Sequence, residues 1–243
     1  MPDQRVARDT VALSIAWTGA LLFAASLAWA AYSYGVRFDR LTPGLPAATA
    51  LVWNTALFSV FALHHSLFAR TGLKALVSRA APAGLERSIY TWIASALFFG
   101  VCLWWQPIDV RVYEIRPPWR LAAYAVQLAG VVLTMRGAAR LDLLDLAGIR
   151  QVERARSGQA PRHTALETDG VYGFVRHPLY FAWFLIVFAA PVMTGTRLAF
   201  AIITTTYLAI AIPWEERSLI LEFGADYRAY QRKVRWRMLP GIY

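Results

Sequence analysis

The sequence predicts an all-α integral membrane protein with about six transmembrane helices and a C-terminal cytoplasmic amphipathic helix. Hydrophobic residues make up 58% of the 243 positions and charged residues only 16%, whereas about a quarter of the residues in a typical soluble domain are charged. The mean hydropathy is +0.41, and the apolar residues stand in long uncharged runs. About 20 apolar residues in a helix cross a bilayer core, and a chain of this length cannot wrap six such helices in a soluble fold.

The uncharged runs set the position of each helix. Membrane helices are expected at 11–34, 47–68, 88–106, 119–136, 178–194 and 198–214. The fourth run is short, and Trp119 and Arg120 extend it because an arginine side chain can reach from the hydrocarbon to the interface. The first run is too long for a cleavable signal peptide and has no small-residue cleavage site. Cys102 is the single cysteine, which excludes an internal disulfide and a multi-cysteine metal cluster; we expect no metal.

The charges give the orientation of these helices. Six spans place both termini on one side of the membrane. Of the 25 Lys and Arg residues, the other side would hold only Arg37, Arg40, Arg111, Arg116, Arg120 and Arg197. Because positively charged loops stay in the cytoplasm, we expect a multi-pass protein of the cytoplasmic (inner) membrane with both termini cytoplasmic. The net charge of +10 is then explained by the topology, and a nucleic-acid partner is not needed to account for it. Membrane lipid is the partner that these cations suggest.

We expect one structural domain with three parts. Residues 1–136 form a four-helix membrane region, residues 137–176 a cytoplasmic loop with short interfacial helices, and residues 177–243 a hairpin with a polar tail. The tail predicts a helix over 215–233, in which Gly224 introduces a break or bend. An amphipathic helix on the membrane surface is the simplest interpretation of this tail. Its apolar and aromatic residues share one helix face: Leu219, Phe223, Tyr227 and Tyr230.

The last two spans predict a tight antiparallel hairpin. Only Gly195–Arg197 separate them, and each span is roughly 27 Å long at about 1.5 Å per residue. The hairpin therefore returns its end, Trp214–Arg217, to its start, Gly173–Tyr180. Two clusters that are distant in the sequence become one site at the cytoplasmic surface.

The two clusters have complementary chemistry. Pro178 suits the first position of a helix, which makes His177 the cap beside free N–H groups that bind anions. Arg176 adds a donor pair that suits a carboxylate, and Glu215 and Glu216 can accept hydrogen bonds from an ammonium group or ribose hydroxyls. Each cluster alone would also serve as a membrane-interface anchor, but their junction favours a ligand site. S-adenosylmethionine carries a carboxylate, an ammonium, a sulfonium and a ribose together.

Three ordered motifs carry a resemblance to a known superfamily. They read Gly-Val-Tyr-Gly-Phe-Val-Arg-His-Pro-Leu-Tyr at 170–180, Glu-Glu-Arg-Ser-Leu at 215–219 and Phe-Gly-Ala-Asp-Tyr-Arg-Ala-Tyr at 223–230. In these motifs, over about 170–240, the chain resembles the membrane methyltransferase superfamily, which includes isoprenylcysteine carboxyl methyltransferases and phospholipid N-methyltransferases. Many relatives have glycine two residues after the motif tyrosine, where this chain has Ala182. Alanine is a mild change that leaves the pocket open.

The remainder of the chain is similar to a narrower group, the methanethiol S-methyltransferases and the NnrU-like proteins. This similarity is looser, but it extends over nearly the whole sequence. The matching stretches are His65-Ser66 with Ala69-Arg70, Glu86-Arg87-Ser88, Trp104-Trp105-Gln106-Pro107, Leu141 to Val152, and Pro191-Val-Met-Thr194.

The resemblance implies S-adenosyl-L-methionine as the cofactor and assigns residues to its site. The catalytic roles would fall to Arg176, Glu215 and Arg217. In-line displacement at a sulfonium methyl chiefly needs positioning and a dry site. A thiol would react as thiolate, whose pKa nearby cations lower; Arg176 and Arg217 are candidates. The cofactor-binding residues implied by position are Tyr172, Val175, Arg176, His177, Pro178, Leu179, Tyr180, Glu215, Glu216, Tyr227 and Tyr230.

Three further residues are candidates for contact with the substrate: His65, Asp142 and Asp145. His65 stands near the cytoplasmic end of the second span, where polar side chains usually face the protein interior; a hydrogen bond between helices would explain it equally. Asp142 and Asp145 are three residues apart and so are neighbours on a helix. Pairing with Arg140 or Arg150 is the structural alternative for both.

The leading hypothesis is a membrane methyltransferase that methylates a small lipophilic thiol, methanethiol, to give dimethyl sulfide. A small thiol partitions through lipid, whereas the charged cofactor reaches the site from the cytosol. A prenylated cysteine carboxylate and a lipid amine are alternative substrates. The alternative from another class of function is an NnrU-like membrane protein without enzymatic activity. The cofactor motifs at both ends of the hairpin argue against it, because a scaffold does not need them. No obligatory protein partner is evident.

Overall fold

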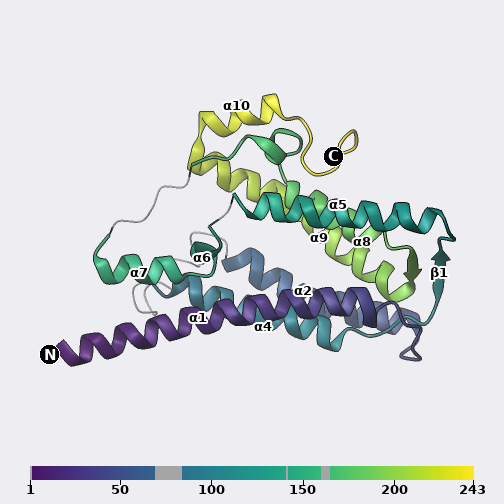
Figure 1. Ribbon diagram of the computed structural model, residues 1–243, viewed down its shortest axis with the longest axis horizontal. Coiled ribbons are helices and arrows are strands. Elements are labelled where there is room, and N and C mark those ends of the chain that lie inside the picture. The colour runs from purple at the N-terminus through teal and green to yellow at the C-terminus, as the bar shows by residue number, and fades with distance from the viewer. Residues whose placement is uncertain (1, 69–83, 141, 160–164) are drawn as a thin grey trace. The chain divides into compact units, whose positions relative to one another are not determined.

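The computed structural model describes residues 2–68, 84–140, 142–159 and 165–243 (Figure 1). The Ala69-Arg70 stretch, part of the 70–87 loop, Leu141, and residues 160–164 of the 137–176 segment lie outside these ranges. The elements described, in chain order, are α1 (Pro2–Tyr32), a π-helical turn η1 (Ser33–Arg37), α2 (Ala47–Phe68), α4 (Glu86–Trp104), β1 (Arg111–Glu114), α5 (Trp119–Ala138), α6 (Leu143–Leu146), α7 (Ile149–Ser157), a 3₁₀ turn η2 (Gly170–Gly173), α8 (Pro178–Phe188), β2 (Val192–Thr194), α9 (Gly195–Phe223) and α10 (Ala225–Lys233).

The helices confirm an all-α integral membrane protein. Within the described ranges, five helices are long and apolar enough to cross a membrane by length and composition. They are Thr10–Arg37, Ala47–Leu67, Glu86–Trp104, Trp119–Ala138 and Gly195–Phe223. A sixth apolar helix, Pro178–Phe188, is shorter. The chain divides into two compact units, one of residues 1–37, 53–105 and 142–163 and one of residues 38–52, 106–141 and 164–243.

The first unit pairs α1 with α4 and adds the short helices α6 and α7. Ala16 of α1 and the apolar residues of α7 share a buried cluster with Leu85. Two arginines on different helices, Arg87 and Arg154, both pair with the carboxylate of Asp145. Thr91 also donates to the carbonyl oxygen of Leu146 over 3.1 Å. These contacts hold the predicted interfacial helices against the end of α4.

The second unit is built on α5, α8 and α9, which pack in sequence against one another (Figure 1). Gly130 lets α5 approach α8 closely, because a Cβ at this position would lie 2.9 Å from the carbonyl oxygen of Ala182 and 2.8 Å from Ile186. Ala182 itself is fully buried, so this crossing is made between small residues. Trp183 joins α8 to α9 by donating to Thr204 Oγ1 over 2.9 Å.

The predicted helix over 178–194 is wrong in its second half. Helix α8 ends at Phe188, because Pro191 cannot donate to a helical ladder and disfavours helix in the residue before it. The next residues form β2, which pairs antiparallel with β1. Eleven residues of α8 span roughly 17 Å, about half of a bilayer core. The connection between the two hairpin helices is therefore Ala189–Thr194, and Gly195–Arg197 begin α9 rather than forming the turn.

The last span and the tail also divide differently from the prediction. Helix α9 continues through Pro213 to Phe223, so Glu215 lies inside it and does not begin a separate tail helix. At about 1.5 Å per residue, its first 20 residues span roughly 30 Å, which places the segment after Trp214 beyond a typical core. The predicted break at Gly224 is confirmed, since this residue has φ +57° and separates α9 from α10.

Candidate active site

The two ends of the hairpin meet, as the sequence predicts. Arg176 Nε donates to Glu216 Oε1 over 2.6 Å, and Tyr180 Oη donates to Glu215 Oε2 over 2.8 Å. Although α8 is short and is followed by a strand, the chain still returns to its start, because α9 packs back against α8 (Figure 1). One cationic and one anionic cluster therefore share a single site.

The start of α8 is fixed from outside the helix. Pro178 occupies the first turn, and His177 is the cap residue with φ −121° and ψ 69°, without a side-chain capping bond. Its backbone N–H donates over 2.8 Å to the carbonyl of Arg237, and the N–H of Arg176 donates over 2.9 Å to that of Trp236. The segment after α10 thus holds the His177 backbone at the start of the helix.

Arg176 is buried and already engaged with the protein. Besides the ion pair with Glu216, its NH1 donates to the carbonyls of Val234 over 2.7 Å and Arg235 over 2.8 Å. The guanidinium therefore links three parts of the chain: the start of α8, the end of α9 and the segment after α10. The expected role of Arg176 as a donor pair for a ligand carboxylate stays a prediction.

Glu216 has polar neighbours on both carboxylate oxygens. Its Oε2 accepts from Gln231 Nε2 over 3.1 Å and lies 3.4 Å from Arg237 Nε. Sequence reasoning missed Gln231 and Arg237, because both lie outside the three motifs. The position of Gln231 four residues after Tyr227 on the same helix is the signal that could have found it.

A cavity of about 300 Å³ opens between the start of α8, the end of α9 and α10. Nine of the eleven residues assigned to the cofactor by resemblance line it: Tyr172, Arg176, His177, Pro178, Leu179, Tyr180, Glu215, Tyr227 and Tyr230. Residues outside the predicted site complete the wall: Ala165, Leu166, Glu167 and Glu222, with Leu219 and Phe223 from the predicted tail face. Val175 and Glu216 are buried outside the lining, and Arg217 is exposed outside it. The roles of all these residues stay predictions.

Two polar atoms at the cavity have no hydrogen-bond partner among the described residues: His177 Nε2 and Tyr227 Oη. The His177 ring stacks on Tyr180 with centroids 5.3 Å apart. Its Nδ1 and Nε2 each lie 3.5 Å from a carboxylate oxygen, of Glu215 and Glu216 respectively, which is too long for a good hydrogen bond. Burial, with the nearby Glu216 carboxylate, raises the pKa of Tyr227 above its usual value, so its hydroxyl is a neutral donor.

Tyr230 contrasts with Tyr227, because its hydroxyl donates to the carbonyl oxygen of Tyr172 over 2.7 Å. This bond joins α10 to η2. The two tyrosines and Val234 also form an apolar cluster that packs α10 against the end of α9. Burial also raises the pKa of Tyr172. The aromatic wall predicted from the tail is thus packed against the 3₁₀ turn that precedes α8.

The charge balance of the lining favours a cationic ligand. Three carboxylates, Glu167, Glu215 and Glu222, face Arg176 and His177, and Arg176 is already paired with Glu216. A ligand with two positive groups and one carboxylate would match this wall better than an anion would.

The three candidate substrate residues lie in the first compact unit. Tyr90 Oη is 2.7 Å from His65 Nδ1. Asp142 pairs with Arg150 at 3.0 Å, and Asp145 pairs with Arg87 and Arg154. The Arg150 pairing is the structural alternative expected for Asp142, while Asp145 takes partners the sequence did not suggest. Over the described ranges, no group of three or more His, Cys, Asp or Glu is placed to hold a metal ion.

Comparison with known proteins decides the family. The model of the isoprenylcysteine carboxyl methyltransferase family matches residues 156–221, which include the start of α8 and the paired glutamates of α9. The methanethiol S-methyltransferase of Crocosphaera subtropica is 34% identical over 187 residues, 76% of this chain and 73% of the relative. That of Mycobacterium tuberculosis is 31% identical over 84% of this chain and 88% of the relative. The chain belongs to the methanethiol S-methyltransferase family.

Family membership makes this chain a membrane-bound methyltransferase, which acts with a methyl donor. The similarity is broad, since Nurim of Xenopus laevis is also 29% identical over 73% of this chain. No solved structure matches the chain. The superfamily inferred from the motifs of the hairpin and tail is thereby confirmed.

Proposed function

We propose that this methyltransferase transfers a methyl group from S-adenosylmethionine to a small lipophilic thiol, methanethiol, and so produces dimethyl sulfide. The observation that carries the proposal is the cavity between α8, α9 and α10, in which His177 Nε2 and Tyr227 Oη have no described partner. Relatives of similar length named methanethiol S-methyltransferase support the thiol substrate.

The residues present fit this methyl donor. The Glu215 carboxylate, with 44% of its side chain exposed, and that of Glu222 can accept from an ammonium group or from ribose hydroxyls. The positive end of the α8 dipole suits the carboxylate of the donor, although the N–H groups of Tyr180 and Phe181 already donate to the His177 carbonyl over 3.1 Å. Tyr227 can donate one hydrogen bond, and the aromatic rings of Tyr172 and Tyr180 give the sulfonium and the adenine flat apolar surfaces.

The chain's residues act mainly by positioning. When bound, S-adenosylmethionine would supply an activated methyl carbon to the thiolate sulfur; the thiol proton would pass to water, and the donor would leave as the neutral thioether S-adenosylhomocysteine. The tyrosine rings line the cavity and would keep it drier once the donor is bound. Arg176 is paired with Glu216, so the positive charge that favours the thiolate over the thiol would come mainly from the sulfonium of the bound donor, with Arg176 as a second cation at the wall. Arg217 is exposed outside the lining, so Arg176 and Glu215 are the stronger catalytic candidates.

The proposal includes a location for the reaction. The five candidate spans, with the shorter apolar helix α8 as part of a sixth crossing, and the excess of cations on the proposed cytoplasmic side support an inner-membrane protein with both termini in the cytoplasm. The charged donor then reaches the cavity from the cytosol, and the thiol reaches it through the surrounding lipid. Lipid is the only further partner proposed.

The test uses membranes that contain the protein, methyl-labelled S-adenosylmethionine and methanethiol. We expect labelled dimethyl sulfide in the headspace, and a loss of about tenfold or more in Glu216→Gln, since removing one member of a buried ion pair leaves the other uncompensated. Label in the lipid extract instead would indicate an isoprenylcysteine or phospholipid substrate. If the purified protein binds no S-adenosylmethionine at millimolar concentration, the proposal is wrong.

A further inference from the structure

We propose that Arg237, with Tyr243, is a positioning residue of the active site, which sets the Glu216 carboxylate and the start of α8 for the methyl donor. The inference rests on the proposed function and deepens it. None of the three sequence motifs includes Arg237, and this residue is not among those that line the cavity. It acts through its neighbours.

The first contact is with Glu216. This carboxylate is only 4% exposed, and a buried carboxylate must be matched by charge and hydrogen bonds. Arg176 pairs with Oε1 at 2.6 Å. On the other side, Arg237 Nε lies 3.4 Å from Oε2, where Gln231 donates over 3.1 Å. Arg237 supplies the second positive charge, so the carboxylate is held between two guanidinium groups.

The second contact fixes Arg237 itself. Its guanidinium lies over the ring of Tyr243, 5.1 Å from the centroid, and NH1 donates to Tyr243 Oη over 3.2 Å. Tyr243 Oη in turn donates to the carbonyl oxygen of Ala209 in α9 over 3.3 Å. The Tyr243 backbone closes this segment on itself through bonds with Met238 and Leu239. A chain of contacts thus runs from α9 through Tyr243 and Arg237 back to Glu216.

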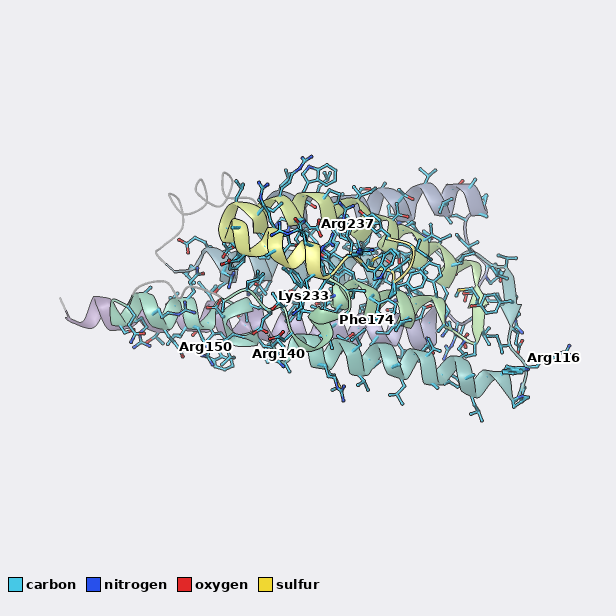
Figure 2. The ribbon with its side chains drawn as sticks, turned by 90° about the horizontal axis from the view of Figure 1, so that it is seen from above. Arg116, Arg140, Arg150, Phe174, Lys233 and Arg237 are labelled. Carbon is cyan, nitrogen blue, oxygen red and sulfur yellow. The ribbon has the colours of Figure 1, made fainter. Side chains whose placement is uncertain are left out.

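The third contact is made by the main chain. The carbonyl of Arg237 accepts the N–H of His177 over 2.8 Å, so one residue contacts the α8 cap through its backbone and Glu216 through its side chain. Figure 2 labels Arg237 in the segment that follows α10, with Lys233 at the end of that helix. Removing the Arg237 side chain would leave the backbone bond and free only the carboxylate.

The experiment measures binding of S-adenosylmethionine to the purified full chain by calorimetry, and KM and kcat with methanethiol. Arg237→Gln should weaken donor binding and raise the KM for the donor by about three- to tenfold, the effect of one lost, partly buried ion pair at 3.4 Å. The value of kcat should change less than twofold, because Arg237 does not touch the reacting groups. Lys233→Gln removes the same charge from an exposed position and should leave both constants unchanged.

Further variants separate positioning from folding. Arg237→Lys should restore much of the donor affinity, and the double variant Glu216→Gln/Arg237→Gln should bind no more weakly than Glu216→Gln alone. If Arg237→Gln does not fold, Tyr243→Phe takes its place in the test, and we expect it to raise the KM for the donor by a smaller factor. If donor binding is unchanged in Arg237→Gln, or in Tyr243→Phe where that variant replaces it, the inference is wrong and the proposed function stands. Failure of the unaltered protein to bind the donor would overturn both.

Discussion

Tyr227 and Tyr230 are neighbours on one face of α10, but their hydroxyl groups differ in what they contact. The Tyr230 hydroxyl is bonded to the Tyr172 carbonyl. The Tyr227 hydroxyl is buried without a partner among the described residues, and an unsatisfied buried polar group costs roughly 1–3 kcal/mol. Because the unpartnered Tyr227 hydroxyl stands at the cavity, we propose that Tyr227 serves ligand recognition and Tyr230 serves the structure.

We therefore predict opposite effects of the two phenylalanine substitutions. Tyr227→Phe should leave the thermal stability of the ligand-free protein equal or higher and weaken S-adenosylmethionine binding by about three- to tenfold, the loss of one hydrogen bond. Tyr230→Phe should lower the stability by about 1 kcal/mol. Thermal unfolding in detergent with and without the donor measures both. A destabilised Tyr227→Phe with normal donor affinity would contradict the assignment.

At the level of elements, the crossing of α5 and α8 places the start of α8. A methyl group at Gly130 would lie within 3 Å of both Ala182 O and Ile186, so the helices would have to separate. Gly130→Ala should lower stability by about 1–3 kcal/mol, as overpacking does, and should reduce methyl transfer because the start of α8 carries His177. Ala125→Val, at an exposed position of α5, is the matched control. Equal melting temperatures for the two variants would show that the crossing tolerates a larger separation.

The helices could be predicted from the sequence wherever an apolar run had clear ends. The second span was predicted at the residues that α2 occupies. The strand β2 was missed because its residues continue the apolar run of α8, and hydropathy alone does not separate a short buried strand from a helix. Its pairing with β1 is a long-range contact, which a local pattern does not contain.

The site was predictable to the extent that its chemistry was local. Arg176 and His177 stand in a motif at the start of α8, and the glutamate pair stands in a motif inside α9; the hairpin alone brings the two motifs together. Gln231 and Arg237 reach Glu216 only because Gly224 turns the chain and α10 folds back on α9. The spacing from Tyr227 could have placed Gln231 on the same helix face, but its contact with Glu216 and the role of Arg237 depend on that tertiary path.

At the scale of the whole molecule, the distribution of charge determines which face of the membrane holds the cavity. The cations gather at the cavity end of the second unit and in its tail, whereas Arg111, Arg116 and Arg120 stand near β1. Because positively charged segments are retained in the cytoplasm, the cavity should open to the cytosol. A charged methyl donor that is made in the cytosol could not otherwise reach it.

This orientation can be measured by cysteine labelling, since the natural Cys102 is buried and can be replaced by alanine. In that background, Arg116→Cys lies between β1 and α5, and Lys233→Cys lies at the end of α10 (Figure 2). We expect a membrane-impermeant maleimide added to intact spheroplasts to label only the cysteine at position 116, and permeabilised spheroplasts to show both labelled. The reverse pattern would place the cavity outside the cytosol. The donor would then have to cross the membrane before it could bind. The reverse pattern would therefore contradict both the predicted topology and the proposed use of S-adenosylmethionine.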